Sequence, residues 1–174
     1  MLTHKQNLDR FAADHCIKLF SHYDIEIQCG VADDSLVGQK FLVCGVIAFT
    51  SKHMRGSLAL AITREPLEQS CPAIVGAGTG SHRDWVCELA NQLLGRVKNQ
   101  LLSHSVEIYQ STPVAVAGQH LCPIQEHRPI AALFTAGAGV VCVWTDCEFD
   151  AQFELSEPSE APCTVGDEGD ILFF

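Results

Sequence analysis

The sequence predicts an α+β protein in which long helices pack on a mainly antiparallel sheet. Two segments carry apolar residues at the spacing of an amphipathic helix, and the strand-like segments arrive as consecutive pairs joined by short links. Strands that follow one another as hairpins pair antiparallel, whereas parallel strands need a long crossover. With 174 residues, 47% of them hydrophobic, the chain has enough apolar material for one domain of ordinary size.

The first predicted helix covers residues 4–21. Thr3 and Gln6 have the spacing of a capping box at its start. The apolar residues that follow recur at helical spacing: Leu8, Phe11, Ala12, Cys16, Leu19 and Phe20. Apolar residues then alternate over 25–29, which predicts a short strand.

A hairpin and a second long helix are predicted next. The segments KFLVCGVIAFT (40–50) and GSLALAIT (56–63) are β-like runs joined by a short link. Prolines and glycines make residues 65–81 mostly irregular, with one short helix at most. The second long helix is expected over 82–102, with Ser81 as its N-cap.

Further strands and a tail complete the prediction. The strand-like runs are VEIYQS (106–111), PVAVAG (113–118) and a pair around a Gly-rich turn (129–149). Each half of the chain therefore gives a helix followed by a hairpin, which suggests an internal pseudo-repeat. The folded domain is expected to cover residues 1–153, and the acidic, aperiodic residues 154–174 are expected to form a flexible tail.

The charge distribution argues against nucleic acid as a partner. The formal net charge is -10, and no Lys or Arg follows Arg128, whereas nine of the 21 acidic residues do. An acidic surface repels phosphate backbones, and no basic stripe with interleaved aromatic residues is present. No apolar run is long enough to span a membrane and the first residues do not resemble a signal peptide, so a cytoplasmic location without membrane contact is expected.

The cysteines and histidines do not form a metal-binding pattern. None of the nine cysteines stands in C-x-x-C spacing, and the eight histidines match no zinc motif. Cys44 and Cys142 lie in apolar strand-like runs, where a reduced cysteine behaves as a small hydrophobic residue. We therefore expect structural thiols and no metal site. The glycine-rich GAGTGS (76–81) lacks the lysine of a P-loop and is expected to be a loop.

The second predicted helix has an unusual polar stripe. Its buried face is predicted by apolar residues within one arc: Val86, Leu89, Ala90, Leu93, Val97 and Leu101. Asp84, Glu88, Asn91 and Gly95 fall on the opposite side, within about 60° of one another. Asp84 can be explained as a helix-capping charge and Glu88 as a solvated helix former. Asn91 and Gly95 are poor helix formers, so the stripe is interpreted as a docking surface that a partner approaches closely.

The motif D-x-x-x-E-x-x-N-x-x-x-G, followed by Pro113 at the start of a strand, resembles the signature of the CheC/CheX/FliY family of chemotaxis phosphatases, closest to its CheX-like members. The segment VCGVIAFTSKHMRGSLALAIT is similar to the family's strand, turn and strand before the phosphatase helix, so the resemblance covers roughly residues 4–150. CheC-type members carry a second E-x-x-N on the first helix, where Ala13 and Cys16 are expected here. One active face per chain is therefore expected, as in CheX. The segment before the second helix is short and proline-broken where CheX usually has a helix.

The resemblance implies that the protein removes phosphate from the aspartyl phosphate of a CheY-like response regulator. The regulator would bring its own Mg²⁺ and lysine, so the phosphatase needs no cofactor and holds a water molecule in line for attack. By this resemblance Asn91 would position the water and Glu88 would pair with the regulator's lysine. Asp84 would be accessory, and Gly95 would allow close approach of the partner.

Two other interpretations remain open. One is a non-catalytic CheX-like binding module that docks on a response regulator or a flagellar switch component, with Glu88 as anchor. The other is a dimeric structural domain whose stripe is simply solvated; a homodimer through sheet edges is implied by CheX-type members. The C-terminal GDILFF (169–174) could tether a regulator, although folding of this segment back on the domain is favoured.

Overall fold

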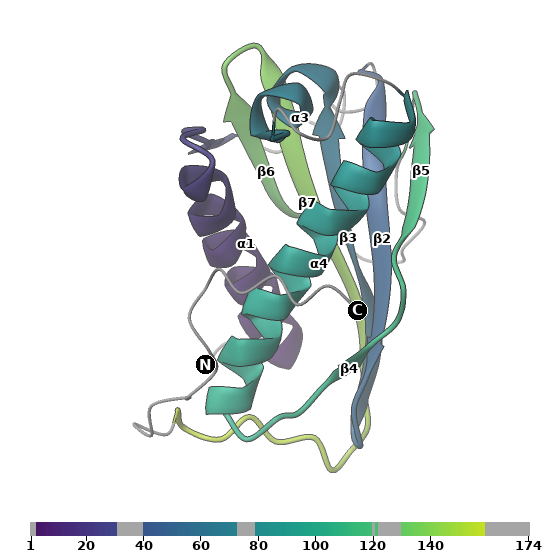
Figure 1. Cartoon of the computed structure of the whole chain (residues 1–174). Coiled ribbons are helices and arrows are strands. Elements are labelled where there is room, and N and C mark those ends of the chain that lie inside the picture. Colours follow the sequence, from purple (N-terminus) through teal and green to yellow (C-terminus); the bar gives the residue numbers. More distant parts are fainter. Residues whose placement is uncertain (1–2, 31–39, 73–78, 120, 122–129, 159–174) are drawn as a thin grey trace.

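The computed structural model in Figure 1 describes residues 3–30, 40–72, 79–119, 121 and 130–158. Two long helices lie on one face of a sheet and a short helix lies near its end (Figure 1). The elements, in chain order, are α1 (His4–His22), β1 (Gln28–Cys29), β2 (Leu42–Thr50), β3 (Met54–Thr63), α3 (Arg64–Ser70), α4 (Thr79–Ser103), β4 (Tyr109–Gln110), β5 (Val114–Gly118), β6 (Ile130–Ala136) and β7 (Gly139–Phe149). The predicted α+β class is confirmed.

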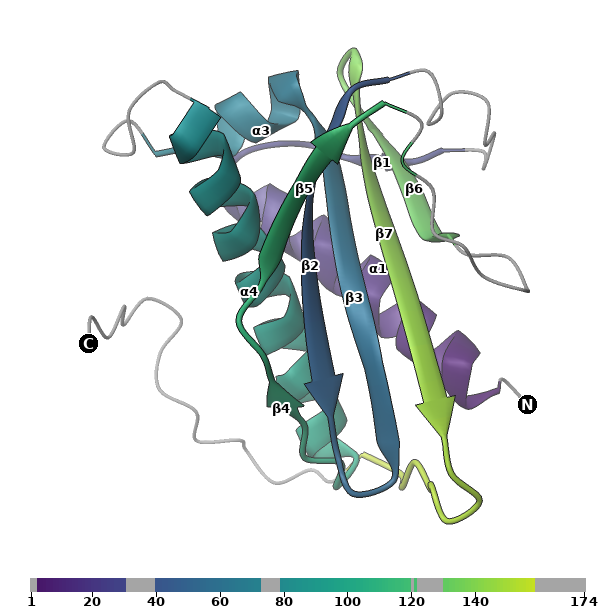
Figure 2. The same cartoon turned by 90° about the vertical axis from the view of Figure 1, so that its right-hand side faces the viewer.

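The described residues form a seven-stranded sheet in the order β1-β6-β7-β3-β2-β4, with β5 also paired to β2. Every pairing among the described strands is antiparallel, as the hairpin pattern predicted. Figure 2 shows β2, β3 and β7 as the long central strands, with α1 and α4 behind them. The helices therefore cover one face of the sheet, and α4 crosses β2 and β3.

The structure supports the internal repeat. The sheet order is symmetric about the β3–β7 pair, since β6 and β1 lie outside β7 as β2 and β4 lie outside β3. The helix ends repeat as well: the N–H of Ile25 bonds the carbonyl of Phe20, and the N–H of Val106 bonds that of Leu101, 81 residues further along the chain. β1 and β4 show the same spacing. The two halves can therefore be aligned residue by residue along their helices.

The start of α1 is confirmed, and that of α4 differs from the prediction. Thr3 and Gln6 form the expected capping box: the Thr3 hydroxyl accepts from the Gln6 N–H, and the Gln6 side chain accepts from the Thr3 N–H. The prediction of Ser81 as the N-cap of α4 is wrong, because the helix already begins at Thr79. The helix therefore begins two residues earlier than predicted.

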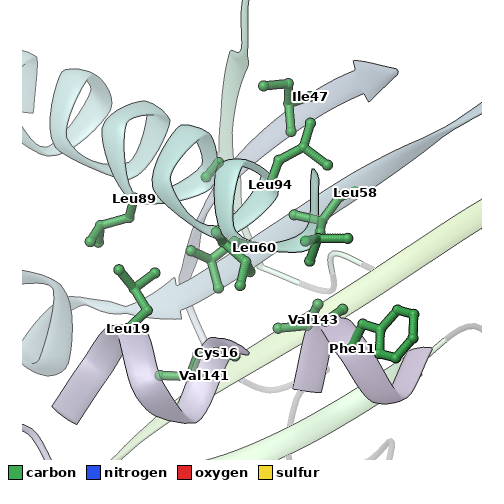
Figure 3. Packing of buried hydrophobic residues seen from close by; sticks show 14 of the residues in the cluster. Phe11, Cys16, Leu19, Ile47, Leu58, Leu60, Leu89, Leu94, Val141 and Val143 are labelled. Atoms are coloured by element: carbon green, nitrogen blue, oxygen red, sulfur yellow. The ribbon is translucent and has the colours of Figure 1, made fainter. Parts of the chain in front are cut away.

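The core lies between the helices and the sheet. All apolar positions predicted for the inner faces of α1 and α4 are buried: Leu8, Phe11, Ala12, Cys16, Leu19, Phe20, Val86, Leu89, Ala90, Leu93, Val97 and Leu101. Figure 3 shows Phe11, Cys16, Leu19 and Leu89 among the buried residues of this core. A glycine on β2 lets α4 come close to the sheet, since a Cβ on Gly45 would lie 2.7 Å from the carbonyl oxygen of Val86 and 3.0 Å from the Cβ of Ala90. The position of α4 thus depends on this one missing side chain.

The opposite face of the sheet has a second apolar cluster that includes Cys44 and Cys142. Burial raises the pKa of both thiols to about 12, so they remain neutral hydrophobic groups, as expected. Within the described part of the chain the cysteines are free.

The chain continues to pack beyond β7. Phe153 is buried in the core, and His104 Nδ1 lies 2.7 Å from the carbonyl oxygen of Ser156. Residues 159–174, most of the expected tail, lie outside the described residues, so the division into domain and tail stays a prediction. Of the helices described, none combines the length and the apolar character needed to cross a membrane.

Candidate functional site

The polar stripe of α4 (Asp84, Glu88, Asn91 and Gly95) lies opposite the buried face of the helix. Asp84 and Glu88 are exposed, and Asn91 and Gly95 are partly exposed. A carboxylate and a carboxamide therefore stand about one helical turn apart on the outer surface of a well-packed helix. The arrangement expected from helical spacing is present.

Gly95 leaves an open space beside these groups. A Cβ placed on it would meet no atom within 4 Å, apart from its chain neighbours and its own helix backbone. The fold itself therefore gives no reason for a glycine at this position, in contrast to Gly45, whose missing side chain makes room for α4. No described residue uses the space at Gly95, so it is open to a partner.

Glu88 belongs to a hydrogen-bonded chain of three side chains. The Gln92 amide donates from Nε2 to Glu88 Oε1 at 2.9 Å, and the Tyr23 hydroxyl donates to Gln92 Oε1 at 2.8 Å. Tyr23 is the C-cap residue of α1. Burial, first of all, raises the pKa of the Tyr23 phenol, and the nearby Glu88 carboxylate adds to the rise. The phenol therefore stays protonated and able to donate.

This chain of side chains was not predicted from the sequence. Gln92 lies four residues after Glu88, so the helical spacing rule could have found this pair. Tyr23 is 69 residues away from Gln92, and no local pattern connects them. Only the packing of α1 against α4 brings the phenol to the stripe.

Helix α3 holds the first turns of α4. The indole N–H of Trp85 donates to Ser70 Oγ at 2.9 Å, and Ser70 Oγ in turn donates to the carbonyl of Leu67. His82 lies 3.3 Å from the Glu68 carboxylate. Residues 65–81 were predicted to contain one short helix at most, and α3 is such a helix. It anchors the end of α4 that carries Asp84.

The helix layer differs in charge from the rest of the chain. Each long helix contains three Lys or Arg and two Asp or Glu residues, a net charge of +1 per helix, within a chain of net charge -10. The site thus lies on the least acidic layer of the molecule, where an acidic partner is repelled least.

The corresponding face of α1 does not carry the E-x-x-N motif, as predicted. The prediction that Ala13 and Cys16 occupy the two motif positions is wrong. The spacing of 81 residues aligns Glu88 with Asn7 and Asn91 with Arg10, in place of Ala13 and Cys16. Cys16 is fully buried and cannot be the counterpart of a surface residue. The expectation of a single E-x-x-N per chain is unchanged.

Among the residues that the structure describes, no three His, Cys, Asp or Glu side chains gather so as to hold a metal ion. The Glu88 carboxylate is the one acidic group within the Tyr23–Gln92–Glu88 chain. It is placed to accept a hydrogen bond from an incoming cationic group through the oxygen that Gln92 does not contact.

Comparison with models of protein families finds no match, and comparison with curated protein sequences finds none either. Solved structures do match. A CheC-like superfamily protein from Shewanella sp. PV-4 is 20% identical, with 81% of this chain and 97% of that chain covered and a TM-score of 0.66. The chemotaxis protein CheX from Vibrio vulnificus is 19% identical over 79% and 93% of the two chains, with a TM-score of 0.64.

A third match is CheX from Borrelia burgdorferi in a complex with CheY, BeF₃ and Mg²⁺, at 11% identity, 85% and 99% coverage and a TM-score of 0.55. These likenesses extend over nearly the whole length of each matched chain, so they concern the complete domain. The chain therefore has the CheC/CheX-type fold, as its resemblance to that family implied.

Proposed function

We propose that the protein dephosphorylates the aspartyl phosphate of a CheY-like response regulator, with the polar stripe of α4 inserted at the regulator's phosphorylated site. The observation that carries the proposal is the pairing of Glu88 and Asn91 on the exposed face of α4, beside the open space at Gly95. The complex of the Borrelia CheX with CheY supports it, because that CheX has the same fold.

This chain needs only to position a water molecule and to contact the regulator. An acyl phosphate is already activated, and water attacks phosphorus while the bond from phosphorus to the aspartyl oxygen breaks, which gives inorganic phosphate and a free carboxylate. The Asn91 carboxamide can hold the water through both its N–H and C=O groups, and its place on a rigid helix fixes the direction of attack. Glu88 would accept a hydrogen bond from the regulator's lysine and set the distance between the two proteins.

Further parts of the proposal concern partners and cofactors. The regulator would supply Mg²⁺, and the phosphatase would add no cofactor. Asp84 would make an accessory contact, and the protein would act in the cytoplasm. A homodimer and a tethering role for residues 169–174, which lie outside the described residues, stay predictions; deletion of these six residues without any loss of regulator affinity would exclude the tether.

The competing proposal is a binding module that docks on a regulator or a flagellar switch component without hydrolysis. It needs Glu88 as an anchor but gives Asn91 no task. A merely structural domain needs neither residue. The partly exposed carboxamide in mid-helix therefore favours the enzyme, since it contributes little to the helix itself.

The test is the rate of loss of acyl phosphate from a panel of phosphorylated CheY-like receivers with Mg²⁺. Wild type should accelerate the loss for at least one receiver. Asn91→Ala should abolish the acceleration and retain binding, whereas Glu88→Ala should weaken binding. Gln152→Ala is the control, because it removes an exposed carboxamide that lies after β7 and outside α4. Tight binding without turnover of any receiver would establish the binding module instead.

A further inference from the structure

We propose that Tyr23 is a positioning residue for Glu88 and acts through Gln92. The effect expected on regulator binding rests on the proposed function, whereas the hydrogen bonds themselves lie within this chain. Tyr23 lies at the end of α1, and Gln92 and Glu88 lie on α4. The hydrogen bond from Tyr23 to Gln92 therefore joins the two long helices beside the polar stripe.

The direction of each hydrogen bond follows from the chemistry of the three groups. A carboxylate only accepts, so the Gln92 amide must turn Nε2 toward Glu88. Its Oε1 then faces Tyr23, whose hydroxyl must donate, at 2.8 Å. Without the phenol, Gln92 Oε1 would lose its partner, and only the bond to Glu88 would hold the amide. The Tyr23 hydroxyl thus anchors the amide through which Gln92 holds Glu88.

The Tyr23 ring is itself held in place. It packs edge-on against Trp85, with ring centroids 5.6 Å apart at an interplanar angle of 82°. Trp85 is in turn hydrogen-bonded to Ser70 of α3. A buried, hydrogen-bonded indole therefore supports the phenol. Through Gln92 the phenol supports an exposed carboxylate that on its own would sample several rotamers.

The internal repeat provides a comparison within the same molecule. The spacing of 81 residues aligns Gln92 with Phe11 and Tyr23 with His104. Phe11 and His104 stack with ring centroids 5.3 Å apart, at an interplanar angle of 25°. At the equivalent position of the repeat, an aromatic pair joins the two helices. Packing of the helices therefore does not require a hydrogen-bonded pair such as Tyr23–Gln92. The Tyr23–Gln92 hydrogen bond lies beside the stripe, and an aromatic pair takes its place in the other half of the repeat.

The first test uses the protein without any partner. NMR relaxation of the Gln92 side-chain amide should show an ordered group in wild type and a mobile one in Tyr23→Phe. Tyr109→Phe is the matched control, because Tyr109 is the other tyrosine of the chain and lies exposed on β4. Equal order of the Gln92 amide in all three proteins would overturn the proposal.

The second test measures affinity for a receiver loaded with BeF₃⁻ and Mg²⁺. Tyr23→Phe should weaken binding about fivefold, the effect of one neutral hydrogen bond, and Gln92→Met should give a similar loss. The two losses should not add, and Tyr23→Phe should have no effect in a Glu88→Ala background. An undiminished effect in that background would show a general structural role and overturn the proposal.

The two tests separate this inference from the proposed function. If wild type neither binds nor dephosphorylates any receiver, the proposed function fails, and the order of the Gln92 amide still decides whether Tyr23 positions Glu88. If wild type is active but Tyr23→Phe leaves both the amide and the affinity unchanged, the positioning role fails and the proposed function stands.

Discussion

Substitution of Gly95 by alanine separates the stability of the fold from the binding of a partner. The new Cβ would meet no atom of the described residues within 4 Å, so none of them has to move. Glycine inside a helix costs about 1 kcal/mol relative to alanine, and Gly95 lies well inside α4. Gly95→Ala should therefore raise the free energy of unfolding by about 1 kcal/mol, or the melting temperature by about 2–4 °C for a domain of this size.

The same substitution should harm the proposed function. A methyl group in the open space would hold a receiver away from Glu88 and Asn91, so the affinity for a phosphorylated receiver and the rate of dephosphorylation should both fall. Urea unfolding and receiver titration on the same preparation measure the two effects. Stability should rise and receiver binding should fall, because no described residue fills the space that the new methyl group would occupy.

Gly45→Ala is the matched control for this experiment. Its Cβ would lie 2.7 Å from the Val86 carbonyl oxygen, so the substitution should destabilise the protein by about 1–3 kcal/mol through overpacking. A Gly95→Ala variant that is not more stable would show that the position has no free space for a Cβ. If it stabilises the fold and leaves receiver binding unchanged, the partner does not approach α4 at Gly95, and the solvated stripe of a structural domain is the better explanation.

Two further predictions concern the packing around the site. Ser70→Ala leaves the buried Trp85 N–H without its acceptor and should lower the free energy of unfolding by about 1–3 kcal/mol, as measured with urea. Burial, followed by Lys18 and Arg96, lowers the pKa of His15, so the folded state disfavours its proton; stability should fall as the pH drops through the unfolded value near 6.5. His15→Gln should reduce this loss between pH 7.5 and 5, and an unchanged pH profile would assign it to other groups.

Much of the fold follows from periodicity. Both long helices and their buried faces were predictable, because a two-sided helix needs an apolar stripe and each apolar residue could be assigned by spacing alone. The hairpin of β2 and β3 was predictable from two β-like apolar runs joined by a short link. The start of α4 was not, since Ser81 is a good N-cap residue in isolation and the preceding residues continue the helix regardless.

The candidate site was predictable only along one helix. Glu88 and Asn91 share a face by spacing, but the contribution of Tyr23 depends on how α1 packs against α4, which local sequence does not determine. The prediction that Cys16 is the counterpart of Asn91 on α1 is wrong, because motif spacing alone does not show where each helix ends. The hydrogen bonds that end α1 and α4 provide the correct alignment.

That alignment shows what the face of α1 lacks. Gly95 corresponds to Asp14, so a carboxylate stands where α4 leaves an open space, and Gln92 corresponds to Phe11, so nothing there can hold a carboxylate in place. The two faces have the same backbone arrangement and differ in side chains. The chain therefore allows a test of whether the E-x-x-N pair is sufficient for the proposed function.

The pair can be moved to α1 by combining Asn7→Glu and Arg10→Asn in a chain that already carries Asn91→Ala. Dephosphorylation of a receiver that wild type turns over should stay at the level of Asn91→Ala alone, because the new pair has neither an open space beside it nor a residue that orients its carboxylate. Circular dichroism and urea unfolding check that the grafted chain folds, which both substituted positions allow since neither is buried. Recovery of most of the wild-type rate would show that two side chains on an outer helix face suffice, and that Gly95 and Gln92 contribute nothing to the reaction.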